Sequence, residues 1–207
     1  MDETAAETNR LLELARGQDS RAFDRLFSLH RPYLRKVVEL RLDRQLRARV
    51  DPSDVVQEAQ MEAFRRLPEY FERRPMPFRL WLRETTQERL IMLRRFHLGA
   101  ACRAAGREVE LPEESSLALA EGLLAPGQTP SQLLMDRERR RQVQEAVALL
   151  RDSDREILVL RTLEALSNTE VAEVLQIDPA TASRYYGRAL LRLREILIGR
   201  GVMESQP

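Results

Sequence analysis

A polar and basic stretch near the end of the chain carries side chains that could read the bases of DNA. Its candidate residues are Thr181, Ser183, Arg184 and Arg188. Hydroxyl groups and guanidinium forks are donors that bind base edges and phosphates in a DNA groove. We expect Thr181, Ser183 and Arg184 to be best placed for base edges, and Arg188, one turn later, to be better placed for phosphate.

The sequence around these residues predicts two helices joined by a tight turn. Ser167 and Glu170 have capping-box spacing, so a first helix should begin near Asn168. Asp178 can cap a second helix, and Pro179 fits its first turn. This is the sequence form of a helix-turn-helix whose second helix enters the major groove. A plain helical hairpin with solvated arginines is the alternative.

A second constellation lies in the first half of the chain. Asp54, Gln57 and Glu58 fall at positions i, i+3 and i+4, which share one helix face. Exposed carboxylates beside an amide would suit a positively charged, helical partner surface. An ordinary solvated helix face is the alternative.

Composition narrows the possible chemistry of the 207 residues. Cys102 is the only cysteine and His30 and His97 are the only histidines, so an internal disulfide is excluded and a zinc site is disfavoured. The chain has no Gly-rich phosphate loop, and an enzyme is the least favoured class. We predict no catalytic residue, metal or cofactor. The polar N-terminus and the lack of a long apolar run predict a cytoplasmic protein without membrane insertion.

The predicted fold class is all-α, because Leu, Arg, Glu and Ala dominate the chain. We expect two small helical domains, at 1–98 and 133–200, the second containing the helix-turn-helix. Residues 99–132 are rich in Pro, Gly and acidic side chains, which predicts a flexible linker. In the first domain we expect a helix from Pro32 to about Leu46, and a later helix that ends at Pro68.

Three segments together resemble a known family. Residues 51–71, 77–95 and 153–197 are similar, in this order, to bacterial RNA polymerase sigma factors of the extracytoplasmic-function type. The unit Asp-x-x-Gln-Glu, followed by an aromatic residue and an Arg-rich helix end, carries the most specific part of the resemblance. The stretch 97–112 is similar to one subgroup of that family.

The resemblance implies a function and partners. It implies a sigma factor that binds core RNA polymerase through Asp54, Gln57 and Glu58, and that directs promoter-specific transcription initiation. Promoter DNA is the second implied partner, and an anti-sigma protein is a further candidate. The helix near 78–97 would melt and capture the upstream promoter element, with Arg79 and Arg89 contacting the DNA backbone.

Both helices that would face DNA depart from the family pattern. Gln87, Glu88 and Arg89 stand in the stretch where asparagines are common, and Met92 stands where an aspartate is common. Ala182 and Ser183 replace an apolar–basic pair in the second helix of the helix-turn-helix. Two other classes therefore stay open, a sigma-like decoy or regulatory interaction protein, and a stand-alone helix-turn-helix regulator.

Overall fold

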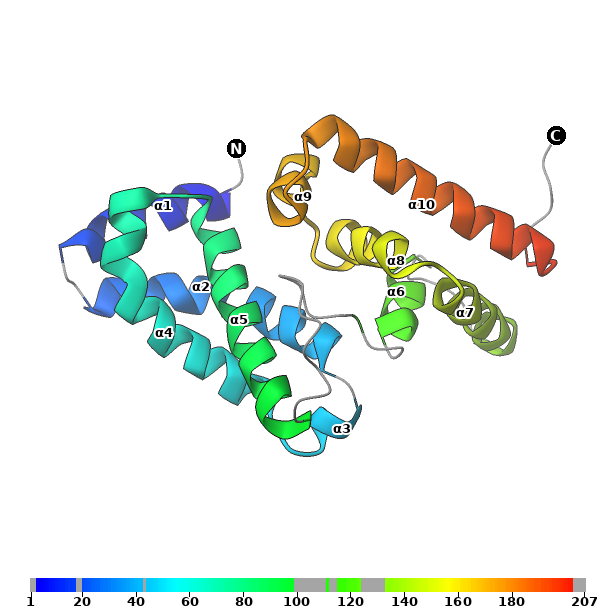
Figure 1. Ribbon diagram of the computed structural model, residues 1–207, viewed down its shortest axis with the longest axis horizontal. Helices are drawn as coiled ribbons and strands as arrows, with labels where there is room; N and C mark the ends of the chain where they lie inside the picture. Colours follow the sequence, from blue (N-terminus) through cyan, green and yellow to red (C-terminus); the bar gives the residue numbers. More distant parts are fainter. Residues whose placement is uncertain are drawn as a thin grey trace. The chain divides into compact units, whose positions relative to one another are not determined.

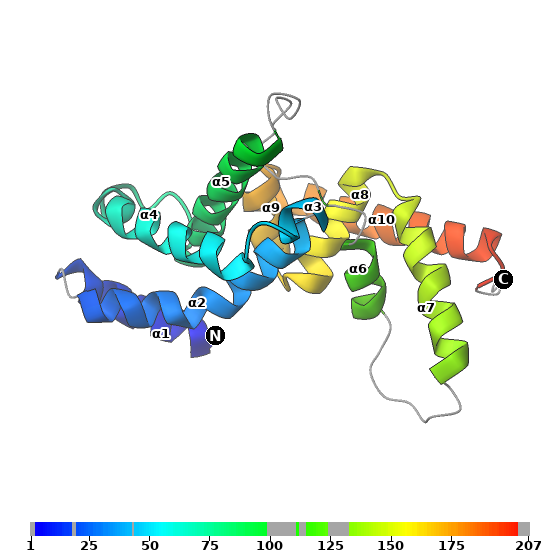
Figure 2. The same cartoon turned by 90° about the horizontal axis from the view of Figure 1, so that it is seen from below.

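The computed structural model describes residues 3–17, 20–42, 44–98, 111, 115–123 and 133–202. Every regular element within these residues is a helix, which confirms the predicted all-α class (Figures 1 and 2). The chain divides into two compact units, Met1–Val109 and Glu110–Pro207. None of the described helices combines the length and the apolar character needed to cross a membrane.

The first unit is a bundle built around three long helices. Its elements are α1 (Glu3–Arg16), α2 (Ser20–Arg41), α3 (Arg44–Arg47), α4 (Pro52–Arg73) and α5 (Phe78–Leu98). Helix α1 packs along α2, and α2, α4 and α5 all contact one another. These three helices enclose the apolar core of the unit.

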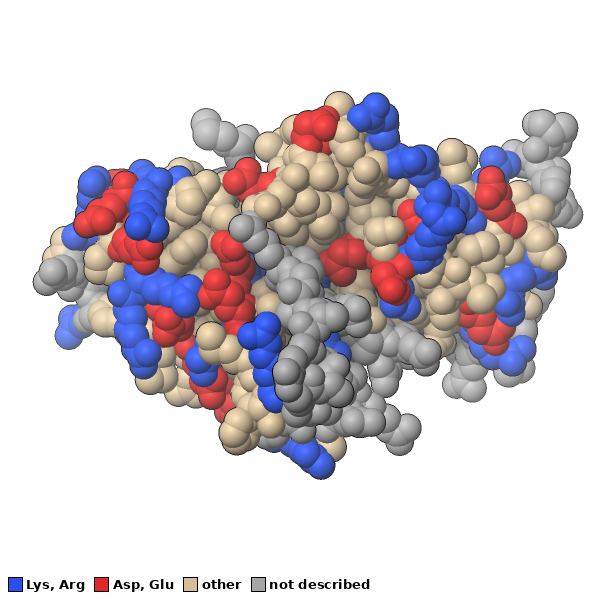
Figure 3. All heavy atoms as spheres, in the orientation of Figure 1, with Lys and Arg blue, Asp and Glu red and all other residues tan. Residues whose placement is uncertain are grey.

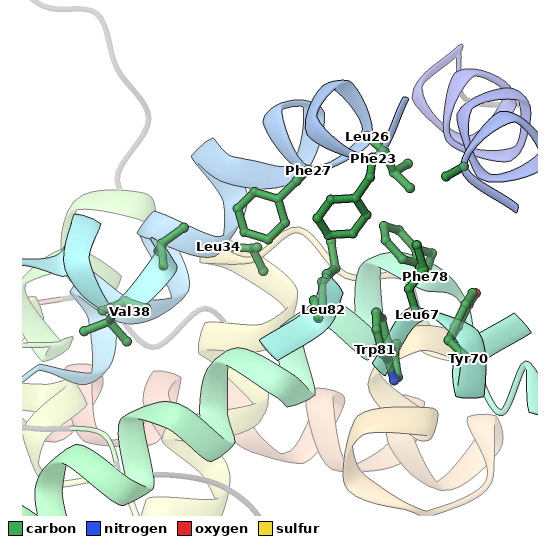
Figure 4. Close-up of a cluster of buried hydrophobic side chains, with 14 of the residues drawn as sticks. Phe23, Leu26, Phe27, Leu34, Val38, Leu67, Tyr70, Phe78, Trp81 and Leu82 are labelled. Carbon is green, nitrogen blue, oxygen red and sulfur yellow. The ribbon is translucent and has the colours of Figure 1, made fainter. Parts of the chain in front are cut away.

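Aromatic and aliphatic side chains at helical spacing fill this core. Figure 4 shows them pointing toward one another from α2, α4 and α5. The Tyr70 ring lies 4.8 Å from the ring of Trp81 and 5.3 Å from that of Phe78, centroid to centroid. Trp81 is only 8% exposed, so it stabilises the fold and is not an open stacking surface.

Two prolines lie inside helices, contrary to expectation. Helix α2 runs unbroken through Pro32, and α4 passes Pro68 to end at Arg73. A proline inside a helix removes one backbone hydrogen bond. Leu67 and Tyr70, on either side of Pro68, are both buried, and this packing holds the helix together past the proline. The helix stops where Arg74 adopts the left-handed conformation, with φ of 37°.

The start of α4 follows a local capping rule. Asp51 is the N-cap, and its Oδ1 accepts a hydrogen bond of 2.7 Å from the backbone N–H of Ser53. Hydrogen bonds from Ser53 lower the pKa of the Asp51 carboxyl. Pro52 occupies the first helical position, where the missing N–H costs nothing. This cap fixes the register of the face that carries Asp54.

The second unit is a smaller helical cluster. Its elements are α6 (Ser115–Leu123), α7 (Leu133–Ala148), α8 (Asp152–Leu158), η3 (Val159–Leu163), α9 (Asn168–Leu175) and α10 (Pro179–Gly199). The element η3 is a turn of π-helix that continues α8 directly. Helix α10 packs against α7, α8 and α9, and α6 packs against α7 and η3.

Helix α6 lies inside the stretch expected to be a linker. Its Leu119 and Ala120 are fully buried, and the helix belongs to the second compact unit. Arg155 adds a further tie by donating to the Leu111 carbonyl at 3.3 Å. Residues 99–110, 112–114 and 124–132 lie outside the described part of the chain. The boundaries 1–98, 99–132 and 133–200 stay predictions, to which α6 adds a packed helix within 99–132.

Candidate functional site

Helix α9 begins with a complete capping box. Ser167 Oγ accepts from the Glu170 backbone N–H at 3.2 Å, and Glu170 Oε2 accepts from the Ser167 N–H at 2.8 Å. Helix α9 therefore starts at Asn168, where the capping box placed it. It ends at Gln176, which adopts the left-handed conformation with φ of 56°.

The N-terminus of α10 is held by Asp178. Its Oδ1 accepts from the Thr181 backbone N–H at 2.8 Å, and its Oδ2 accepts from the Thr181 hydroxyl at 2.6 Å. These hydrogen bonds lower the pKa of the Asp178 carboxyl. Ala182 and Ala189 face inward and are buried, so α10 can lie close to the helices beneath it. The outer face of α10 carries polar and basic side chains together with Leu191, which is 58% exposed.

Three of the four candidate DNA-reading residues share that outer face. Thr181, Arg184 and Arg188 lie within one stripe, because helical positions advance by about 100° per residue. Arg184 Nη2 donates to Thr181 Oγ1 at 2.7 Å. The Arg188 guanidinium lies 4.6 Å from the centre of the Tyr185 ring. Ser183 is also exposed, but it points well away from Thr181 around the helix.

Other arginines of this unit stabilise the fold. Arg192 on α10 pairs with Asp154 on α8 at 2.5 Å, and Arg200 pairs with Glu145 on α7. The Arg161 guanidinium donates to the Leu166 carbonyl and lies 5.3 Å from the centre of the Tyr186 ring. Neither Arg184 nor Arg188 has a carboxylate partner among the described residues. Figure 3 shows basic side chains gathered over α10.

Residues 140–193, from α7 to α10, match the family model Sigma-70, region 4. This part of the chain is similar to Sigma-70 region 4. The match identifies α9 and α10 as the helix-turn-helix of region 4. The match favours this helix-turn-helix over the plain helical hairpin that the sequence left open.

The fold of the chain is similar to that of CnrH, whose solved structure is in complex with the cytosolic domain of CnrY. The likeness has a TM-score of 0.56 and covers 93% of this chain and 98% of CnrH, at 21% sequence identity. This likeness shows a shared fold, and the region 4 match agrees with the resemblance to sigma factors. No match is found among curated protein sequences.

The three candidate polymerase-binding residues of α4, which are Asp54, Gln57 and Glu58, differ in their surroundings. Asp54 and Gln57 are exposed on α4, and the Asp54 carboxylate has no ion pair among the described residues. Glu58 turns toward α5, where its Oε2 accepts from Arg89 Nη2 at 2.5 Å. Of the three residues predicted to share this face, Asp54 and Gln57 are therefore open to a partner, and Glu58 is not.

An apolar hollow, missed by the sequence analysis, lies beside Gln57. Its lining residues are Phe23, Asp24, Gln57, Gln60, Met61 and Phe64. Met61 and Phe64 are 56% and 51% exposed, although both are large and apolar. Their spacing could have revealed them, because Asp54, Gln57, Met61 and Phe64 fall at i, i+3, i+7 and i+10, along one helical stripe.

The two arginines expected to contact DNA from α5 both have partners within the first unit. The Arg79 guanidinium lies 4.0 Å from the centre of the Tyr33 ring, on α2. Arg89 pairs with Glu58 as described. Phe96 is the exposed aromatic residue of α5, at 82%, in contrast to buried Trp81. The DNA contacts of Arg79 and Arg89 stay predictions.

Proposed function

We propose that this protein binds core RNA polymerase and directs promoter-specific transcription initiation as a sigma factor. The single observation that carries the proposal is the outer face of α10 in region 4. There Thr181, Arg184 and Arg188 share one stripe, and the two arginines have no carboxylate partner among the described residues. Guanidinium groups placed on the second helix of a helix-turn-helix reach base edges and phosphates in the major groove.

The first unit would supply the polymerase contact through α4. The α4 stripe, defined as Asp54, Gln57, Met61 and Phe64, combines a carboxylate, an amide and two exposed apolar side chains. Such a mixture suits a stable protein interface, in which apolar groups are buried and charge selects a basic partner. Glu58 would contribute less than Asp54, because Arg89 already neutralises it.

Helix α5 would contact the upstream promoter element. Arg79 and Arg89 could reach phosphates after their contacts with Tyr33 and Glu58 break. An exposed aromatic side chain can stack on an unpaired base, and Phe96 offers such a ring. Among the residues that depart from the family pattern here, Met92 is the one open to a base, because Gln87 is buried and Glu88 pairs with Arg66.

A protein regulator is a further proposed partner. CnrH forms a complex with the cytosolic domain of CnrY. By analogy with that complex, we propose an anti-sigma protein for this chain. The chain itself would perform no catalysis, since the polymerase carries out RNA synthesis.

Run-off transcription with purified core polymerase on a promoter library tests the proposal. Wild-type protein should select a subset of promoters, and Asp54→Arg and Arg184→Ala should each reduce their transcripts. Polymerase binding without any selected transcript would support the decoy. DNA binding without polymerase binding would support a stand-alone regulator.

A further inference from the structure

Three side chains form a continuous hydrogen-bonded chain over the first two turns of α10. The Thr181 hydroxyl donates to Asp178 Oδ2 at 2.6 Å, and Arg184 Nη2 donates to Thr181 Oγ1 at 2.7 Å. The three residues are spaced at i, i+3 and i+6, so they rise along one side of the helix. Arg184 is thus connected to the helix cap through a single hydroxyl group.

The direction of these bonds follows from the chemistry of the three groups. An ionised carboxylate can only accept, and a guanidinium can only donate. The hydroxyl of Thr181 has one proton, so that proton must point toward Asp178, and an oxygen lone pair must face Arg184. The Thr181 hydroxyl therefore has no proton left to donate to a base edge.

The same arrangement restricts Arg184. A free arginine side chain samples many rotamers, and ordering it on DNA costs conformational entropy. The bond to Thr181 already holds the guanidinium over the outer face of α10 before DNA binds. It uses one N–H of Nη2, so donors remain for a bidentate contact with O6 and N7 of a guanine.

We propose that Thr181 is a positioning residue, which holds the Arg184 guanidinium in the orientation that binds a guanine and donates no hydrogen bond to a base itself. This reassigns Thr181 from base reading to support of Arg184. The inference rests on the proposed function, because it requires region 4 to read a promoter.

The test compares base preference in four variants of the full chain, assembled with core polymerase. These are Thr181→Val, Thr181→Ser, Arg184→Ala and the double variant Thr181→Val/Arg184→Ala. Binding is measured to promoter duplexes that carry each base pair in turn at every position of the distal element. Thr181→Val keeps the side-chain volume and the backbone N–H that Asp178 caps, so the start of α10 should remain intact.

Arg184→Ala should abolish the guanine preference at one position. Thr181→Val should reduce the same preference, on the order of tenfold or less, within the range that one bidentate contact supplies. Thr181→Ser should restore it, because serine keeps the hydroxyl. In the Arg184→Ala background, Thr181→Val should change no preference further.

Two results would overturn the positioning role of Thr181 and leave the proposed promoter reading intact. One is a loss of preference by Thr181→Val at a different position from Arg184→Ala, and the other is a further loss in the double variant. Either result would mean that Thr181 contacts a base directly. A wild-type protein that binds polymerase but discriminates no base pair would overturn the proposed promoter reading as well, which separates the two failures.

Discussion

Arg89 on α5 donates from Nη2 to Glu58 Oε2 on α4 at 2.5 Å. The sequence assigned these two residues to different partners, Arg89 to DNA and Glu58 to polymerase. In the free chain each is the partner of the other. A second pair of opposite polarity, Arg66 on α4 with Glu88 on α5, spans the same helix interface at 2.6 Å. Charged residues of α4 and α5 thus join the proposed polymerase-binding helix to the proposed promoter-melting helix.

The Glu58–Arg89 pair should contribute modestly to stability. Both side chains are partly exposed, at 42% and 30%, so solvent screens their attraction. A double-mutant cycle with Glu58→Ala, Arg89→Ala and the double variant should give a coupling energy of about 0.5–1 kcal/mol. Urea unfolding at low and high salt measures it, and the coupling should fall at high salt. Strictly additive effects of the two substitutions would contradict a working ion pair.

Reversing Asp54 should act on polymerase binding more than on the fold. Asp54 is exposed and without an ion pair in the described part of the chain, so Asp54→Arg should cost only the favourable charge in the first turn of α4, about 0.3–1 kcal/mol. Binding to core polymerase should weaken by on the order of tenfold, since a favourable charge contact becomes repulsive. Glu69→Arg, an exposed reversal about four turns further along α4, is the control for the charge change, and it also breaks the surface ion pair of Glu69 with Arg73 at 2.7 Å. Equal binding by wild type and Asp54→Arg would remove Asp54 from the interface.

The sequence predicted the helix-turn-helix well because its signals are local. Ser167 with Glu170, and Asp178 with Pro179, set the two helix starts through bonds spanning three residues or fewer. The different environments of Asp54 and Glu58 could not be predicted in the same way. Their spacing places both on one face, but the position of Arg89, 31 residues after Glu58, decides which carboxylate is neutralised.

Pro68 illustrates a second limit of local rules. A proline usually ends a helix because it lacks an N–H and crowds the preceding turn. Here the burial of Leu67 and Tyr70 holds α4 together beyond it, and only the tertiary structure reveals that burial. The exposure of Met61 and Phe64 has the same origin, because apolar residues on a helix are assigned inward unless packing shows otherwise.

Buried His30 should make the first unit less stable at acidic pH. Burial, with a smaller contribution from the Arg79 charge, lowers the pKa of His30 from 6.5 to about 4. The unfolded chain therefore binds a proton between pH 6.5 and 4 that the folded chain does not. Above pH 6.5 His30 does not reduce the free energy of unfolding. As the pH falls from 6.5 to 4, that free energy falls by about 3 kcal/mol in total.

The variant His30→Gln isolates this effect from other titrating groups. Glutamine cannot take up a proton in this range, yet it can still hydrogen-bond Thr8, whose Oγ1 lies 3.1 Å from His30 Nε2. Between pH 6.5 and 4.5 the wild type should lose stability faster than His30→Gln, by up to about 1.4 kcal/mol per pH unit. The free energy of unfolding in urea is measured for both proteins across this pH range. If it changed with pH equally in wild type and His30→Gln, His30 would have the same pKa in the folded and the unfolded chain.

Ala165 should be replaceable by glycine with a gain in stability. Ala165 follows η3 by two residues and has φ of 53°, in the left-handed region that penalises a Cβ atom. Ala165→Gly removes this strain but adds freedom to the unfolded chain, so a net gain of about 0.5–1 kcal/mol is expected. Ala180→Gly, in the first turn of α10, is the control and should lose stability. Thermal unfolding compares the two, and a loss for Ala165→Gly would refute the strain.

Arg188 should supply affinity without base preference. It lies one turn after Arg184 on the outer face of α10, and its guanidinium rests 4.6 Å from the Tyr185 ring centre. A cation over an aromatic ring is held in place yet keeps its donors for a phosphate. Arg188→Ala should weaken binding to all promoter variants alike and reduce the slope of log affinity against log salt by about one.

Tyr185 provides the matched pair of variants for this role. Tyr185→Phe keeps a ring beneath Arg188 and should bind DNA nearly as wild type, whereas Tyr185→Ala frees the guanidinium and should weaken binding at every promoter. Because a phosphate contact is blind to sequence, neither change should alter the ranking of single-base variants. If Arg188→Ala instead changed that ranking while Arg184→Ala weakened all promoters equally, the two arginines would have exchanged roles. Arg188 would then be the residue that reads a base.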